Sequence, residues 1–137
     1  MDNPGIYFLS VPVSTAGTQI TARASDITDL DGILGLSISI QFIAGTGGAS
    51  VDAFLQQTFD SGFTYQDVAH ASFATTNATK QFNVSGLTPK TAPVTPGDGT
   101  LTADTAQDGI LGGDLRLKVV SAGTYAGAQV VCRVAAR

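Results

Sequence analysis

Glutamate is absent from this sequence, and all eleven acidic residues are aspartates. Glutamate favours helices, whereas the short aspartate side chain caps turns by accepting hydrogen bonds from nearby backbone N–H groups. Residues 51–57 could form about two helical turns, but turn signals flank them at residues 47–48 and 61–62, so we favour a strand. With 16 glycines, the composition is typical of short strands joined by tight turns, although a bias of the lineage would also remove glutamate.

Charge of either sign is scarce. Only 13% of the residues are charged, against about 25% in an average soluble protein, and the net charge is -4. The seven basic residues are scattered and form no run, which argues against nucleic-acid binding through phosphate neutralisation. So weakly charged a surface suits a chain that is normally packed against another surface.

Long apolar runs and a leader pattern are also missing. The sequence has no apolar run long enough for a transmembrane helix, which needs about 18 residues, and we expect no membrane partner. The first five residues, Met-Asp-Asn-Pro-Gly, do not join a basic segment to an apolar one. We therefore expect no secretory signal, and synthesis in the cytosol.

Groups that could carry catalysis are few. The single cysteine, Cys132, excludes an internal disulfide and is expected to be an inert core thiol within the apolar run 128–136. His70, the one histidine, would have to be the base of any triad, yet no Gly-x-Ser-x-Gly sequence accompanies it. Asp60 and Asp67 could pair for glycoside hydrolysis, but there is no tryptophan to form a sugar platform. We expect no enzyme, no cofactor and no metal site.

Alternation of apolar and polar residues predicts a series of strands. The clearest example is Leu36, Ile38, Ile40 and Phe42, which alternate with serines and a glutamine. Further strands are expected near residues 6–13, 19–23, 51–57, 65–73, 80–84, 115–119 and 130–134. We predict one all-β domain over residues 1–137, an antiparallel β-sandwich with jelly-roll or Greek-key connections and one long loop at residues 85–107.

A short pattern occurs twice. Asp31-Gly32-Ile-Leu-Gly35 recurs as Asp108-Gly109-Ile-Leu-Gly112. Each copy precedes an alternating strand, an Ala-Gly-Thr turn and another apolar strand. We interpret the two units as equivalent hairpins, in which glycine adopts backbone angles closed to other residues and the Ile-Leu pair plugs the end of the core.

An Asp-box pattern spans residues 58–65. Its defining members are Thr58, Asp60, Gly62, Thr64 and Tyr65. The carboxylate is expected to cap N–H groups of the turn, the glycine to be left-handed and the aromatic ring to lie under the hairpin. Asp-boxes are best known in sialidase-like propellers, where they are structural turns. We therefore expect a structural turn here, rather than a site that processes sugars.

Two groups of aspartates could supply oxygen ligands to Ca²⁺. One group is Asp26, Asp29 and Asp31, and the other is Asp98, Asp104 and Asp108. Neither has the spacing of an EF-hand, and no glutamate is present to close a site. Capping of turns is the interpretation we favour, and Ca²⁺ binding is left open.

The long loop is rich in proline and threonine. Its candidate partner-binding residues are Pro89, Pro93, Pro96, Asp98 and Gly99. Loops this long are uncommon in a small sandwich and are usually functional or disordered. We expect an arm that clasps an adjacent subunit, and a merely mobile loop is the alternative.

Several stretches together resemble small proteins encoded in the head-and-tail gene clusters of tailed bacteriophages and prophages. They are residues 58–68, 73, 80–87, 108–112, 115–118 and 122–127, and the resemblance covers roughly residues 31–137. The commoner aromatic residue after the Asp-box turn is tryptophan, and Tyr65 stands there instead.

The resemblance implies a virion structural protein located on the particle and made in the host cytoplasm. Within that class we expect a capsid decoration, or cement, protein that binds the outside of the head shell and stabilises it. Its partners would be the major capsid protein and further copies of itself, as a homotrimer. A head–tail junction or tail component is the alternative within the class. A carbohydrate-binding sandwich is the alternative from another class, with Tyr7, Tyr65 and Tyr125 as its only tyrosines.

Overall fold

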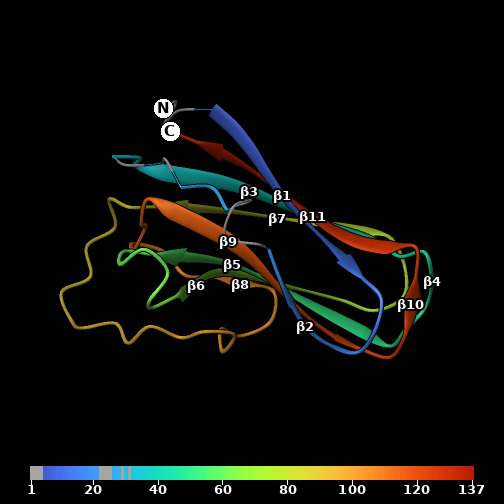
Figure 1. Ribbon diagram of the computed structural model, residues 1–137. Coiled ribbons are helices and arrows are strands. Elements are labelled where there is room, and N and C mark those ends of the chain that lie inside the picture. The colour runs from blue at the N-terminus through green and yellow to red at the C-terminus, as the bar shows by residue number, and fades with distance from the viewer. Residues whose placement is uncertain (1–4, 22–25, 29, 31) are drawn as a thin grey trace.

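The fold is an all-β antiparallel sandwich, as the computed structural model shows in Figure 1. The structure describes residues 5–21, 26–28, 30 and 32–137. Its strands are β1 (Gly5–Val13), β2 (Gly17–Ile20), β3 (Gly35–Ile43), β4 (Thr46–Gly47), β5 (Ser50–Thr58), β6 (Gln66–Phe73), β7 (Ala78–Ser85), β8 (Thr105–Ala106), β9 (Asp114–Ala122), β10 (Tyr125–Ala126) and β11 (Ala128–Ala136). Within the described residues no helix is long and apolar enough to cross a bilayer.

Two sheets form the layers of the sandwich. The first has four strands in the order β1-β11-β3-β7, and the second has five in the order β2-β9-β5-β6-β8. A small ribbon of β4 and β10 closes one end, on the right of Figure 1. All pairs are antiparallel. The expectation of an antiparallel sandwich is confirmed.

Period-two alternation explains the core. On β3 the side chains of Leu36, Ile38, Ile40 and Phe42 are at most 2% exposed and belong to the core between the sheets, where Phe42 packs on Phe73 of β6, while the residues between them point outward. On β1 the odd-numbered residues face the core and the even-numbered residues face outward. Its inward side chains are Tyr7, Leu9, Val11 and Val13, so Ile6 and Phe8 lie outside the core, at 80% and 70% exposure.

The repeated pattern does not make two hairpins, so this interpretation was wrong. The first unit runs from β3 in the four-stranded sheet through β4 to β5 in the other, and the second runs from β9 through β10 back to β11. Each unit is therefore an arch between the layers. The arches pair with each other throughout, because β3 pairs with β11, β5 with β9 and β4 with β10. Alternation within a strand carries no information on which sheet the strand joins.

The long loop runs around one end of the sandwich and along the outer side of the five-stranded sheet (Figure 1). It ends in the two-residue strand β8, which pairs with β6. The Gly97 carbonyl accepts from the Asp67 N–H of β6, and the N–H groups of residues 99–101 donate to the Asp67 carboxylate. This sheet is therefore covered on its outer face, whereas the four-stranded sheet presents its outer face to solvent.

Candidate functional site

The turn between β5 and β6 is held by its own side chains. The Thr58 hydroxyl donates to Asp60 Oδ1 at 2.8 Å and accepts from the N–H groups of Asp60 and Gly62. Asp60 Oδ1 also accepts from the Thr64 N–H at 2.7 Å. Gly62 has φ +95°, in the left-handed region that favours glycine. The pKa of Asp60 lies below its ordinary value of 3.8. The largest cause is the hydrogen bond from the Thr64 N–H, and the second is the bond from the Thr58 hydroxyl.

The turn carries three aromatic rings, of which Tyr65 is packed against a neighbouring side chain and Phe59 and Phe63 are exposed. Arg116 stacks on the Tyr65 ring, with its guanidinium carbon 3.3 Å from the ring centroid. Phe59 is 72% exposed and Phe63 is 93% exposed. Side chains this large usually lose most of their exposed area on folding. The turn therefore holds two phenylalanine rings in water on a rigid backbone, a feature that the Asp-box pattern alone did not predict.

The repeated pattern supplies a second tethered turn. Asp108 accepts hydrogen bonds from the Ser85 N–H and the Thr88 hydroxyl, and the first of these chiefly lowers its pKa. Gly109 has φ +95° and Gly112 packs against the Thr58 carbonyl. In the first copy, Gly32 has φ +83° and Gly35 lies close to the Val84 carbonyl, whereas Asp31 lies outside the described residues. The Ile-Leu pairs plug the core only in part, because Leu34 is 55% exposed.

The carboxylate of Asp67 anchors the long loop. It is 3% exposed and accepts from the N–H groups of Gly99, Thr100 and Leu101 at 2.8–3.0 Å. It also accepts from the Gln56 amide at 2.8 Å. A carboxyl group can be buried at low cost only when its oxygens are hydrogen-bonded in this way. No local sequence pattern indicates that a residue on β6 holds a loop that lies more than 30 positions away.

Asp98 adds a charged tether on the surface. It bonds Gln56 at 2.7 Å and Lys118 at 2.8 Å, with Arg116 at 3.4 Å. Burial alone would raise the pKa of Asp98, but the bonds from Lys118 and Gln56 outweigh it and lower the pKa. Asp98 and Gly99 thus contact their own sheet, while the candidate residues Pro89, Pro93 and Pro96 are exposed. The prolines remain free to contact a partner, and the interpretation of the loop as an arm stays a prediction.

The two scarce reactive side chains are tied into the structure. His70 places Nδ1 2.7 Å from the Leu101 carbonyl and Nε2 2.9 Å from Asp52, and its ring stacks on Phe54. The imidazole therefore fixes the loop to the sheet, with both nitrogens occupied. Cys132 is buried, and burial raises the pKa of its thiol to about 12. At that pKa the reactive thiolate is scarce at neutral pH.

The aspartates proposed as Ca²⁺ ligands have separate partners. Asp98 bonds Lys118, Asp104 bonds Lys80 and the Ser72 N–H, and Asp108 bonds Ser85 and Thr88. Among the described residues no group of three or more metal-ligating side chains comes together. Asp26 accepts from the Thr21 hydroxyl, and its neighbours Asp29 and Asp31 lie outside the described residues.

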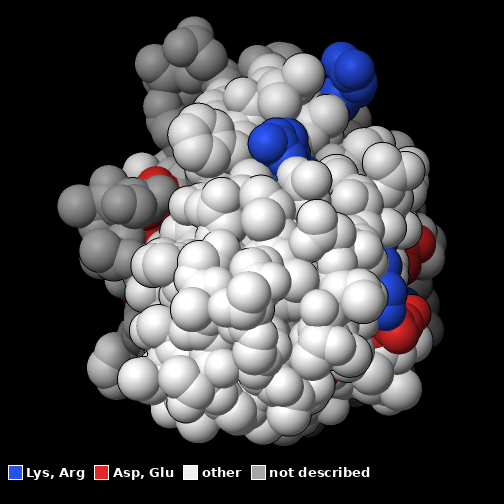
Figure 2. Space-filling model, turned by 90° about the vertical axis from the view of Figure 1, so that its right-hand side faces the viewer, with Lys and Arg blue, Asp and Glu red and all other residues white. Residues whose placement is uncertain are grey.

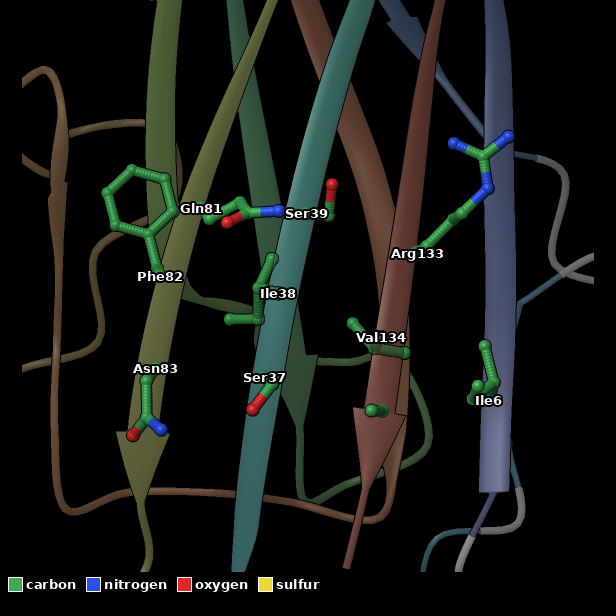
Figure 3. A pocket seen from close by; sticks show the side chains of 10 residues that line it. Ile6, Ser37, Ile38, Ser39, Gln81, Phe82, Asn83, Arg133 and Val134 are labelled. Atoms are coloured by element: carbon green, nitrogen blue, oxygen red, sulfur yellow. The ribbon is translucent and has the colours of Figure 1, made fainter.

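A groove of about 600 Å³ crosses the outer face of the four-stranded sheet (Figure 3). Its floor carries small side chains on the two central strands, Ser37 and Ser39 of β3 and Ala135 of β11. Its walls are larger residues, Ile6 on edge strand β1 and Gln81 and Asn83 on edge strand β7, and Arg133 lies beside the floor. Alternation predicts that these positions face outward but does not predict that small residues will gather in the middle.

At one end of the sandwich, the connecting loops carry no charged side chain among the residues that the structure describes. These loops are at residues 14–16, 44–49, 74–77 and 122–127. All their residues are uncharged, and all are small apart from Tyr125. Figure 2 looks onto this end and shows a broad uncharged surface over the middle and lower part of the view, with basic side chains above it and charges of both signs at the right edge. Tyr125 is buried there by an edge-on contact with Phe42 and a hydrogen bond to the Ala74 carbonyl.

No protein-family model matches the chain, and no curated protein matches it. Among solved structures, a carbohydrate-binding module described as "CBM4 structure and function" is 16% identical to the chain, with a TM-score of 0.40. The match covers 95% of this chain and 82% of that one. The module is likewise a β-sandwich, and a likeness this distant carries no argument about ligands.

Proposed function

We propose that this chain is a non-enzymatic structural protein of a tailed-bacteriophage particle, a decoration protein that binds the outside of the head shell. The class comes from the sequence resemblance. The structural observation that supports docking is the set of large apolar side chains that remain exposed around a complete core. They are Ile6, Phe8, Ile20, Leu34, Phe59, Phe63 and Leu87.

Exposed apolar side chains of this size are what a docking surface needs. Monomeric proteins rarely expose large apolar patches unless the patches bind something. The centres of protein interfaces are also depleted of charge, and the four described loops at one end of this sandwich carry none. A small body that repeats such contacts around a symmetric shell gains strength from many weak sites. Its mechanism is mechanical, because each shell subunit must break added contacts before it can separate.

The side chains that an enzyme would need are used for structure. His70 and Asp67 hold the long loop, and Cys132 is enclosed by the core. Side chains held in this way are suited to a structural role rather than to proton transfer, which needs a poised group open to substrate.

The test compares particles assembled in the presence of this chain with particles from a strain in which its gene has been deleted. We expect the chain in purified particles at a regular copy number, and we expect particles without it to release DNA at a lower temperature. Release at the same temperature would contradict a stabilising role, and absence of the chain from particles would overturn the virion assignment.

The groove supports a second candidate function, a carbohydrate-binding module. Hydroxyl and amide groups from Ser37, Ser39, Gln81 and Asn83 line it, and such groups hydrogen-bond sugar hydroxyls. Stacking would have to come from phenylalanine, because Tyr7 packs against the core, Tyr65 is covered by Arg116 and Tyr125 is buried. Titration with neutral oligosaccharides tests this candidate, and loss of binding in Asn83→Ala would assign it to the groove.

A further inference from the structure

The β5–β6 turn projects from the molecule as a rigid apolar knob, which we define as Phe59, Asp60 and Phe63. The two rings are 72% and 93% exposed. The bonds of Asp60 to Thr58 and Thr64 fix the backbone between them. A preordered aromatic group loses little conformational entropy on binding, so it is an effective anchor for an interface.

The groove on the four-stranded sheet is a socket of matching size and chemistry. Pockets of about 300–1,000 Å³ enclose whole drug-sized ligands, so about 600 Å³ has room for a phenylalanine ring and part of the turn that carries it. Ile6 supplies an apolar wall. Gln81 and Asn83 supply amide groups on the opposite wall, where they could bond the backbone of an inserted turn.

The knob and the groove also carry charges of opposite sign. The knob carries Asp60, which lies between Phe59 and Phe63 in the sequence and whose Oδ1 accepts bonds within the turn. The groove carries Arg133, whose guanidinium donates one bond to Gln41 and keeps its positive charge there. Asp60 is the charged residue of the knob, and no acidic residue lines the groove within the described residues. A second copy of the chain therefore brings an apolar ring and a negative charge to a site that offers an apolar wall and a positive charge.

We propose that the knob of one copy docks in the sheet groove of a second copy. The knob and the groove are different surfaces, so the contact is heterologous: every copy offers both halves, and repetition builds a ring if the rotation closes. The inference deepens the self-association part of the proposed function, because a decoration protein bound at a symmetric site can contact its own neighbours.

The experiment measures mass by sizing chromatography with light scattering over a concentration series. Wild-type protein is expected to reach a multiple of the 13.9 kDa chain mass. Phe63→Ser removes the knob and Ser37→Glu places a negative charge in the groove against Asp60. Each is expected to weaken association by about thirtyfold or more. Leu87→Ser is the matched control, since Leu87 is an exposed apolar residue outside both surfaces.

Mixing the two variants identifies the heterologous contact. Phe63→Ser retains an intact groove and Ser37→Glu retains an intact knob, so an equal mixture is expected to form a species of twice the chain mass. Both substitutions are at exposed positions, and an unchanged thermal unfolding midpoint verifies folding. A wild-type monomer at every concentration, Phe63→Ser that associates normally, or a mixture that stays monomeric would each overturn the proposal.

The other occupants of the groove are separate outcomes of the same preparation. Binding of a neutral oligosaccharide by monomeric wild-type protein would overturn self-association and favour the second candidate function. The sizing experiment contains no shell, so its failure leaves the virion proposal standing. Absence of the chain from particles would likewise leave a sizing result intact.

Discussion

Single glycines determine whether the two arches can approach each other. Gly45 has φ +57°, and a Cβ placed on it would collide with the Ala126 carbonyl. Gly123 holds the equivalent place in the other arch, with φ +82° and a hypothetical Cβ 2.9 Å from the Ala49 nitrogen. Both the left-handed backbone and the lack of space therefore require glycine at these positions.

Gly45→Ala is expected to lower the free energy of unfolding by about 3 kcal/mol or more, because a left-handed alanine costs about 1–2 kcal/mol and the collision adds to it. Gly127→Ala is the control. Its φ is +71°, but nothing lies within 4 Å of the added Cβ, so only the backbone cost of about 1 kcal/mol is expected. Urea unfolding measures both, and equal losses would show that the arches tolerate closer packing than described.

At the scale of elements, the long loop depends on one buried carboxylate. Asp67 binds three consecutive N–H groups, so replacing one of its oxygens by an amide NH₂ group would set donor against donor. Asp67→Asn is expected to cost about 2–4 kcal/mol and to raise amide hydrogen exchange at residues 99–101.

Asp104→Asn is the comparison for this prediction, because Asp104 also bonds a backbone N–H but its side chain is 50% exposed. Its loss is expected to stay within about 1 kcal/mol. Protection at residues 99–101 that survives in Asp67→Asn would show that other contacts hold the loop.

The positions of the long strands could be predicted from the sequence, because alternation is a local signal. It predicted β3, β5, β7 and β9 within a few residues. The short strands β4, β8 and β10 have two residues each and form only because distant segments meet, so no local pattern reveals them. The assignment of strands to sheets was missed for the same reason, and the expected hairpins proved to be arches.

The candidate surfaces also combine features that a local pattern predicts with features that only the complete fold determines. The Asp-box pattern predicts a tethered turn, since its hydrogen bonds join residues at most four positions apart. The exposure of Phe59 and Phe63 depends on which parts of the chain fail to cover them, and only the completed fold decides that. The groove likewise arises from small residues on β3 and β11, two strands that are far apart in the sequence.

For the whole molecule, acid is expected to loosen the turns before it affects the core. Hydrogen bonds hold the pKa values of Asp60, Asp104 and Asp108 below the ordinary 3.8, chiefly from the Thr64 N–H, Lys80 and the Ser85 N–H respectively. A lowered folded pKa contributes stability that is present above the unfolded value and is lost as pH falls through the folded value.

Urea unfolding at a series of pH values is therefore expected to show the free energy of unfolding falling below about pH 4, with the steepest loss beneath 3.8. Asp60→Asn and Asp108→Asn should each flatten this acid limb. Stability that rises as pH falls through this range would contradict the assigned hydrogen bonds, because it would mean that the protonated carboxyls are preferred in the folded state.

The molecule as a whole combines a covered sheet with an open one. The long loop shields the five-stranded sheet, while the groove, Phe8 and the knob remain exposed. Under the proposed function, the surfaces open to a partner are therefore the four-stranded sheet, the β5–β6 turn and the uncharged loops at one end. This arrangement is the physical basis for a docking role.

The most direct measurement is a reconstruction of a particle that carries this chain, at a resolution that resolves strands. The account predicts density for the sandwich on the outer surface of the head shell, with the exposed apolar side chains turned toward shell subunits or toward neighbouring copies. Density at the portal vertex or along the tail would contradict decoration, and a particle with no density for the chain would contradict the structural role itself.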